Sequence, residues 1–218
     1  MPKLNLSADE VLTTTRAVRK RLDFDRPVEM EVIRECLQVA LQAPSGSNTQ
    51  DWQFLVVTDP EKIAKIAEFY RSAFADYEAS DFQPTAHHKG DAEMEQTQVR
   101  VLSSAKYLAE NLHRVPALLI PCSTIRPDLP GMPLSAIAGI TGSIIPATWS
   151  FMLAAREYGI GTCWTTLHLE FEKEIAALLN IPETVAQIAL IPIAYTKGTD
   201  FKPGPRTDLD KSLHIDSW

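Results

Sequence analysis

The spacing of apolar residues along the chain predicts helices and strands that alternate with one another. An apolar residue recurs every three or four positions, as in helices with one buried face, in residues 27–43, 60–74, 99–113, 143–158 and 170–179. Short apolar runs between turn-forming residues, which predict strands, occupy residues 52–58, 117–122, 161–166 and 186–195. These interleaved elements favour an α/β or α+β sandwich around a central sheet, and the few, unevenly spaced strands argue against an eightfold barrel.

Residues near the N-terminus carry the signals for two helices. We expect the threonines at 13–15 to cap a short first helix that contains Arg16 and Arg19, and residues three apart share one face of a helix. Pro27 should open the second helix, and Pro44 should end it, because the residue before a proline is pushed out of the helical conformation. This interpretation places both arginines on a helix surface.

Three further features concern segments that are not simple helices or strands. Residues 76–98 are polar and predict an excursion or lid, and residues 197–218 predict an extended tail that packs only where another surface receives it. Pro192 interrupts the last predicted strand, which indicates an edge position or a strand end.

An uncharged stretch between Asp128 and Arg156 is long enough to raise the question of a membrane span. It contains three prolines and three glycines, and no basic cluster lies close to either side. We therefore interpret it as a loop followed by a helix that is buried on most of its circumference, in the core or at a subunit interface, and not as a membrane span.

Composition and charge exclude several classes of protein. The chain has 218 residues, enough for one domain with a full core, and 45% of them are hydrophobic, which excludes a disordered protein. The net charge of −7 argues against a general nucleic-acid binder, which needs a positive surface. The three cysteines form no metal-binding or disulfide pattern. No signal peptide is visible, so a cytoplasmic location is expected.

The usual catalytic motifs are missing from the sequence. It contains no phosphate-binding P-loop, no G-x-G-x-x-G fingerprint, no G-x-S-x-G elbow and no H-E-x-x-H zinc motif. His87 and His88 form the one histidine pair, and adjacent side chains point apart on regular elements, so we expect no metal site. No side-chain nucleophile stands out, which indicates that a bound cofactor carries the chemistry of any reaction.

Four stretches nevertheless combine residues that suit a ligand. Arg16, Arg19, Lys20 and Arg21 concentrate positive charge in an acidic chain and suit a phosphate group, although such runs are often only solvated surface. The loop within residues 43–52 offers small hydrogen-bonding groups, and the segment 159–166 offers backbone amides and two hydroxyls. Residues 202–206 add a second basic point. Ordinary turns and a solvated tail are the alternative interpretation of these last three stretches.

The order of these pieces resembles the nitroreductase family of flavin enzymes. The matching pieces, of which the proline-serine-glycine loop is the most specific, are Thr15–Arg19, Pro27–Val28, Ala43–Trp52, Gly159–Thr166 and Arg206. Two positions depart from the family pattern, because Thr15 replaces its leading arginine and Ala17 its serine. Lys20 or Lys202 could supply the missing contacts. The polar segment 76–98 matches no part of the pattern.

The resemblance implies a single domain over residues 1–218, built as an α+β, three-layer α/β/α sandwich with a central mixed sheet, an extended C-terminal tail and a homodimeric assembly. It implies FMN at two sites between the subunits, with Arg16, Arg19 and Arg206 on the phosphate. The loop from the partner chain would line the flavin, and Thr165 and Thr166 would approach its ring. The full set of cofactor-binding candidates is Arg16, Arg19, Lys20, Ser45, Gly46, Ser47, Asn48, Gln50, Trp164, Thr165, Thr166 and Arg206.

The activity implied by the resemblance is an FMN-dependent oxidoreductase that passes electrons from NADH or NADPH to a nitroaromatic, a quinone or a similar electron-poor ring in a ping-pong scheme. The aromatic side chains that would shape the substrate face, or simply fill the core, are Tyr70, Phe74, Tyr77 and Phe82. Two alternatives stay open: another FMN enzyme of the same fold, of dehalogenase or dehydrogenase type, and a flavin-binding protein without catalysis. The sequence does not distinguish NADH from NADPH or identify the natural acceptor.

Overall fold

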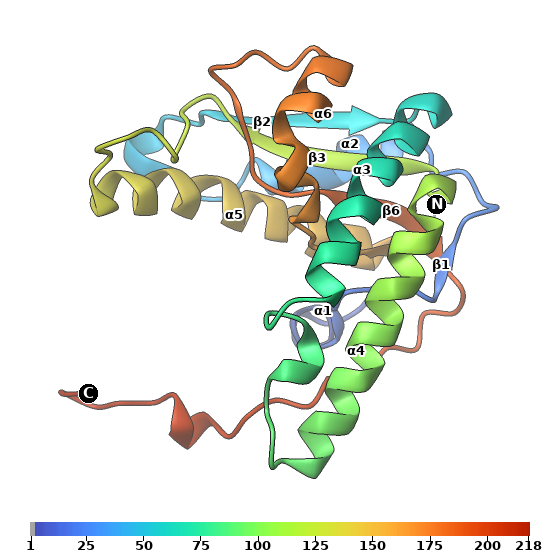
Figure 1. The fold of residues 1–218 in the computed structure, drawn as a ribbon, viewed down its shortest axis with the longest axis vertical. Coiled ribbons are helices and arrows are strands. Elements are labelled where there is room, and N and C mark those ends of the chain that lie inside the picture. Colours follow the sequence, from blue (N-terminus) through green and yellow to red (C-terminus); the bar gives the residue numbers. More distant parts are fainter. Residues whose placement is uncertain (1–2) are drawn as a thin grey trace.

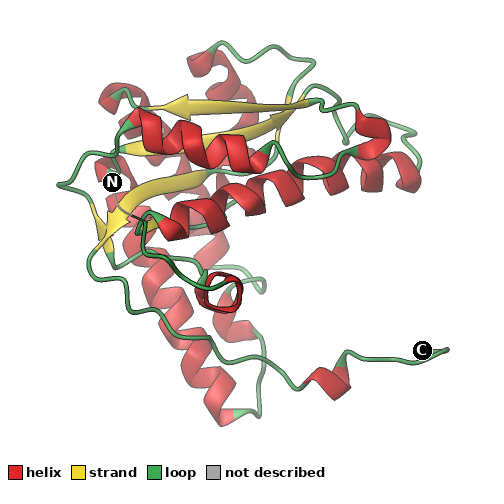
Figure 2. Cartoon of the chain, turned by 180° about the vertical axis from the view of Figure 1, so that it is seen from behind, coloured by secondary structure: helices red, strands yellow, loops and turns green. Residues whose placement is uncertain are grey.

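A central sheet lies between two layers of helices in the computed structural model, which describes residues 3–218 (Figures 1 and 2). The helices are α1 (Ala8–Thr14), α2 (Met30–Ala40), α3 (Pro60–Glu78), α4 (Ala92–Asn111), α5 (Leu134–Glu157) and α6 (Glu172–Leu179). The strands are β1 (Leu22–Asp23), β2 (Trp52–Val57), β3 (Ala117–Ser123), β4 (Ile160–Thr162), β5 (Ala186–Gln187) and β6 (Ile191–Thr196). The α+β sandwich predicted from the sequence is confirmed.

The sheet has β6 and β3 at its centre, in the order β1-β6-β3-β2, with β4 paired to β6 and β5 paired to β3. The named strand pairs are antiparallel, and a parallel bridge joins Ala17 to Thr162, so the sheet is mixed. Alternate residues of a strand face opposite layers. On β3, Leu118 and Ile120 accordingly pack toward α3, α4 and α6, while Leu119 packs toward α2 and α5. The layer with α3, α4 and α6 lies in front of the sheet in Figure 1, and the layer with α2 and α5 lies in front of it in Figure 2.

The first predicted helix lies in a different place from the one expected. The helix α1 ends at Thr14, and Arg16 and Arg19 follow it in an extended segment, so the prediction that they share a helix face is wrong. Ser7 and Glu10 form a capping box that starts α1 early. After the helix, Val18 donates its backbone N–H to the carbonyl of Thr162 at 2.8 Å, which ties this segment to the sheet.

The uncharged stretch forms a longer and less buried helix than predicted. The helix α5 begins at Leu134, and only 33% of its most apolar window is buried in the chain. The expectation of burial on most of its circumference is therefore wrong for the single chain. By length and composition α5 could span a membrane, but its buried face packs on α2 and on the sheet, as a core helix does.

Two other predictions need correction. The expected lid at 76–98 is shorter, because α3 runs to Glu78 and α4 starts at Ala92, which leaves residues 79–91 between them. Pro192 is the second residue of β6, as the strand-end alternative expected, but it does not lie at a sheet edge, because it pairs with Leu118 of β3. On its other side the pairing of β6 with β4 ends at Ile193, so no strand there requires the N–H that proline lacks.

The side chain of His168 gives the fold a pH dependence. It is fully buried against α3, and within residues 3–218 neither ring nitrogen finds a hydrogen-bond partner. Burial disfavours the imidazolium and lowers the pKa of His168 to about 3, from 6.5. Below pH 6.5 the imidazole of His168 is therefore protonated in the unfolded chain, whereas in the native chain it stays neutral down to about pH 3.

We expect this group to remove about 1.4 kcal/mol of unfolding free energy for each pH unit below 6.5. Urea unfolding of the native protein and of His168→Leu, each at pH 7 and pH 5, measures the effect. The loss of stability between the two pH values should be smaller in the variant by about 2 kcal/mol. Equal losses in the two proteins would contradict the assignment.

Candidate functional site

The start of the C-terminal tail is fixed to the body of the chain by two arginines and one aromatic ring. The guanidinium carbons of Arg21 and Arg156 lie 4.2 and 5.0 Å from the ring centroid of Phe201. Arg21 also donates to Asp200 at 2.6 Å and to the carbonyl of Lys197 at 3.0 Å. These contacts set the path of the residues that follow Phe201.

Beyond this anchor the tail crosses the first basic segment, so that Arg16 and Arg206 lie close together. Arg16 donates to the carbonyl of Lys202 at 2.8 Å. A methyl group on Gly204 would meet Arg206 Nη1 at 2.9 Å and Arg16 Nη2 at 3.2 Å. Two guanidinium groups from opposite ends of the sequence therefore flank one glycine. The family resemblance implied that these two arginines lie close together.

The other basic side chains of this segment reach the helix α4. Arg19 Nη1 donates to Ser104 Oγ at 3.2 Å, and Lys20 Nζ donates to Ser103 Oγ at 2.8 Å. Sequence reasoning did not identify either serine, because serine is an ordinary residue on a helix surface and nothing in its spacing marks a ligand. Both hydroxyls accept these bonds, and the Ser104 hydroxyl itself donates to the carbonyl of Val101 at 2.9 Å.

A cleft of about 610 Å³ lies between residues 16–20 and α4. It is lined by Arg16, Ala17, Arg19, Lys20, Thr97, Val99, Arg100, Val101, Ser103, Ser104 and Pro205. No carboxylate stands among these residues, although the chain as a whole has a net charge of −7. We call this the basic cleft. Its donors and its uncompensated positive charge suit a phosphate group, so the residues present fit the anionic end of FMN.

The segment after β4 meets the basic cleft through Arg19. Burial raises the pKa of the Cys163 thiol, and the neighbouring Arg19 opposes that shift by its charge and by a hydrogen bond. Thr165 is buried and donates its hydroxyl to the carbonyl of Leu190 at 2.8 Å. Trp164 is half-buried and Thr166 is exposed. The hydroxyl hydrogen of Thr165 is thus used in a bond within the chain, whereas the side chain of Thr166 is accessible to a ligand.

The aromatic residues proposed for a substrate face divide into two kinds. Tyr70 and Phe74 are buried in the core, with 3% and 4% of their surface exposed, so core packing accounts for them. Tyr77 is half-buried, and Phe82 is 78% exposed in the short segment between α3 and α4. Only the last two can meet a ligand.

The loop at residues 45–50 lies elsewhere in the chain, against the N-terminal half of α5. Gly46 donates its backbone N–H to Ser143 Oγ at 2.9 Å. Ser47, Asn48 and Gln50 have φ angles of 50°, 54° and 49°, in the left-handed region that side chains seldom adopt. Such strain often accompanies a binding role. The side chain of Gln50 donates to Asn48 Oδ1 at 3.1 Å within the loop, and none of residues 45–50 lines the basic cleft.

The two groups of predicted site residues do not meet within one chain. The loop packs near Ser143, whereas the basic segment bridges to Thr162, just beyond the other end of α5 at Glu157. Fourteen residues of helix separate Ser143 from Glu157, or roughly 20 Å at 1.5 Å per residue. A single ligand held by both groups would need the loop of another copy.

The two departures from the family pattern have structural consequences. The Thr15 hydroxyl donates to the carbonyl of Val11 at 2.7 Å, so it closes the end of α1 and does not replace an arginine. Ala17 lines the basic cleft without a polar group. Of the two substitutes considered, Lys20 lines the cleft, and Lys202 contributes its carbonyl to Arg16.

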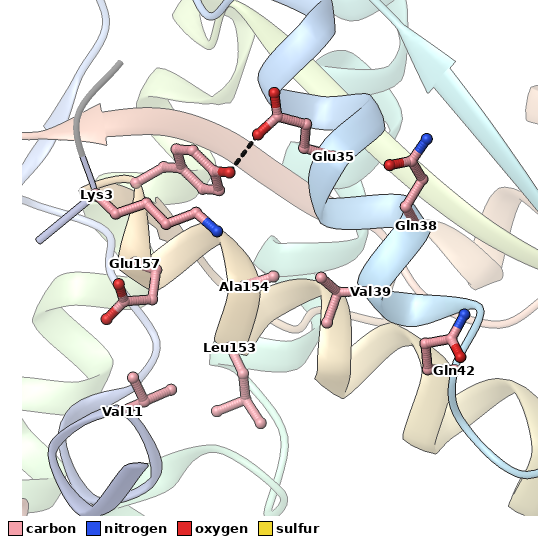
Figure 3. Close-up of a pocket in the computed structure, with 10 residues that line it drawn as sticks. Lys3, Val11, Glu35, Gln38, Val39, Gln42, Leu153, Ala154 and Glu157 are labelled. Atoms are coloured by element: carbon pink, nitrogen blue, oxygen red, sulfur yellow. Dashed lines mark hydrogen bonds between the residues drawn. The ribbon is translucent and has the colours of Figure 1, made fainter. Parts of the chain in front are cut away.

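A larger hollow of about 740 Å³ lies between α1, α2 and α5 and contains none of the predicted site residues (Figure 3). The Tyr158 hydroxyl donates to Glu35, and this bond raises the pKa of Tyr158 to about 12. The ammonium group of Lys3 lies 5.2 Å from the centre of the same ring. With Glu35 and Glu157 in its wall, the hollow is a poor site for a phosphate.

Comparison with known proteins gives a consistent match. The profile of the family described as "Nitroreductase family" matches residues 12–195. The 4-nitrobenzoate reductase of Pseudomonas putida is 26% identical over 199 residues, which cover 86% of this chain and 84% of that protein. The structure of NfnB, an FMN and NADPH-dependent nitroreductase from sphigopyxis sp. strain HMH, superposes with a TM-score of 0.72 at 20% sequence identity. The superposition covers 98% of this chain and 100% of that one.

A third match involves a different reaction on the same fold. The structure of oxidized iodotyrosine deiodinase bound to FMN and 3-iodo-L-tyrosine superposes with a TM-score of 0.64 and 22% identity, and covers 92% of this chain and 95% of that one. At these identities the structural matches establish the fold, and the profile establishes the relationship by descent.

Proposed function

The chain belongs to the nitroreductase family, and from this premise we propose that it is an FMN-dependent oxidoreductase. In this proposal NADH or NADPH reduces the flavin and leaves, and a nitroaromatic, quinone or similar electron-poor acceptor then takes the electrons in a ping-pong cycle. FMN supplies the redox chemistry. The residues of the chain bind and orient it, and no side chain is assigned as a nucleophile.

The basic cleft is the observation that carries this proposal. Arg16, Arg19 and Lys20 all point their charges toward neutral oxygens there, and Arg206 lies beside Arg16. We assign Arg16 and Arg206 to the phosphate of FMN, with Lys20 as a further cation. Arg19, the most enclosed of these side chains, would lie nearer the ring, next to the segment with Trp164, Thr165 and Thr166.

We also propose that the active form is a homodimer with two sites between the subunits. The exposed face of α5 carries Ala138, Gly142, Ile145 and Trp149 at spacings of four, three and four residues, without a charge. Such a stripe is typical of a helix that packs on a partner. The loop at 45–50 would then reach the basic cleft of the other copy, which the single chain cannot achieve. A cytoplasmic location completes this proposal.

A dehalogenating flavin enzyme is the second candidate, favoured by the structural likeness to iodotyrosine deiodinase. Yellow purified protein that releases FMN on denaturation, and that NADH or NADPH bleaches without oxygen, would support the oxidoreductase. Turnover of nitroaromatics against halogenated phenols under those conditions distinguishes the two activities. Bound FMN that neither nucleotide bleaches would indicate a flavin-binding protein without catalysis, and a colourless protein that takes up no FMN would refute the whole proposal.

The exposed tail residue Arg206 provides a direct test of the phosphate site. Arg206→Ala removes one charge-assisted contact, and we expect FMN affinity to fall by roughly 10-fold while the melting temperature of the FMN-free protein stays the same. Fluorescence titration of FMN-free protein with FMN measures the affinity. Arg71→Ala, which removes an exposed arginine from α3, serves as the control. Equal flavin affinity in all three proteins would count against the role of the tail.

A further inference from the structure

The basic cleft contains more positive charge than one phosphate group requires. Arg16, Arg19, Lys20 and Arg100 line it, and Arg206 lies at its end beside Arg16. A phosphate monoester carries about two negative charges near neutral pH. Binding of FMN by this cleft would leave cationic side chains without a counter-charge.

Several basic residues elsewhere in the chain form ion pairs with carboxylates. Arg126 pairs with Glu172 at 2.8 Å, and Lys106 pairs with Glu78 at 3.0 Å. The ion pairs found among residues 3–218 include none of the four cations that line the cleft. These four hydrogen-bond to a carbonyl or to hydroxyl groups. The lining of the cleft thus gathers four cations without a carboxylate, and such a concentration of positive charge attracts anions.

Arg100 has its own hydrogen-bond partner on α4, away from the serines that Arg19 and Lys20 contact. Its Nη2 donates to Thr97 Oγ1 at 2.9 Å, one turn earlier on α4. Ser104, the partner of Arg19, lies four residues later on the same face of the helix, about 6 Å along the axis. Arg16 and Arg206 meet at Gly204, next to Pro205 in the wall of the cleft. Along α4, Arg100 is thus one helical turn from the serine that Arg19 contacts.

The surroundings of Arg100 suit a small organic anion. Val99 and Val101 line the cleft on either side of it and offer apolar contact to a ring. The guanidinium of Arg100 is exposed, and a neutral threonine hydroxyl is its hydrogen-bond partner, so it can bind a carboxylate or phosphate with two parallel hydrogen bonds.

We propose that Arg100 recognises a second anionic group, carried by a molecule that exchanges electrons with the flavin. The group is either a carboxylate on an aromatic acceptor or the 2′-phosphate that distinguishes NADPH from NADH. The inference rests on the function proposed above, and it names Arg100 as a specificity determinant for that reaction.

The experiment uses the FMN-loaded protein and substrate pairs that differ by one anionic group. The KM ratio of nitrobenzene to 4-nitrobenzoate isolates the carboxylate, and the KM ratio of NADH to NADPH isolates the phosphate. Both are measured for the native protein, Arg100→Ala, Arg100→Lys and the control Arg71→Ala. Benzoate, which cannot be reduced, is titrated into each oxidised protein and followed by the flavin absorbance, which provides a reading that does not depend on turnover.

We expect Arg100→Ala to lower one of the two KM ratios by about 10-fold, the value of a charge-assisted hydrogen bond. Arg100→Lys should restore part of it, and Arg71→Ala should leave both unchanged. A change confined to the nitrobenzoate ratio, with weaker benzoate binding, identifies a carboxylated acceptor. A change confined to the nucleotide ratio identifies the 2′-phosphate.

Two results would overturn the inference while the proposed function stands. One is that both ratios in Arg100→Ala equal those of the native protein. The other is that Arg100→Ala loses FMN as Arg206→Ala is expected to, because Arg100 would then belong to the cofactor phosphate. A native protein that binds no FMN and is reduced by neither nucleotide would refute the proposed function itself.

Discussion

The double substitution Ile145→Glu with Trp149→Glu is expected to convert the protein into a monomer that does not retain FMN. These side chains are 42% and 38% exposed on the uncharged face of α5, so the single chain tolerates glutamates there. In a dimer that buries this face, each unpaired carboxylate costs about 3 kcal/mol or more, and the dimer weakens at least roughly 100-fold. Light scattering after gel filtration gives the mass, and the absorbance of the flavin gives the occupancy.

The control for this change is Arg71→Glu on α3, which shifts the net charge by the same two units at an exposed position on another face. We expect the control to remain dimeric and yellow. A double variant of α5 that is still a dimer with full flavin content would contradict the assigned interface. A variant that is monomeric but keeps its flavin would contradict the proposal that the 45–50 loop of the partner completes the site.

The parts of the fold that the sequence predicted well are those governed by local patterns. The apolar run at 117–122 corresponds to β3, which is buried on both faces, and such a strand shows no alternation to misread. The run from Trp52 corresponds to β2, which ends at Val57. Helix ends were harder to predict. The helix predicted at 143–158 already contained Pro146, but α5 begins nine residues earlier, directly after Pro133.

The candidate site was predictable in its basic residues and less so in its geometry. The resemblance to the nitroreductase family brought Arg16 and Arg206 together although 190 positions separate them, and in the structure both lie beside Gly204. The prediction that Arg16 lies on a helix was wrong. The hydrogen bond between Val18 and Thr162 holds this segment in an extended conformation, and no local sequence pattern predicts that contact. Contacts from α4, such as Ser104, depend on tertiary packing, and a serine on a helix gives no sign of them.

Arg19 connects the basic cleft with the segment after β4. Its replacement should change the reduction potential of the flavin more than the affinity of the protein for the flavin. The side chain is half-buried between Ser104 of α4 and Cys163 of the segment after β4. A positive charge held near the flavin ring favours the reduced, anionic form over the oxidised, neutral form. Burial strengthens this preference, because water screens an enclosed charge less than an exposed one.

We expect Arg19→Gln to make the bound flavin harder to reduce by about 1.5 to 3 kcal/mol, the range for a hydrogen bond to a charged group. For a two-electron couple this corresponds to a potential lower by roughly 30 to 65 mV. Anaerobic titration against a reference dye measures the potential, and stopped-flow reduction by NADPH should slow in parallel. Arg206→Ala, which acts at the phosphate, should weaken binding and leave the potential of the bound flavin unchanged. Equal potentials in the native protein and Arg19→Gln would place Arg19 with the phosphate cations and away from the ring.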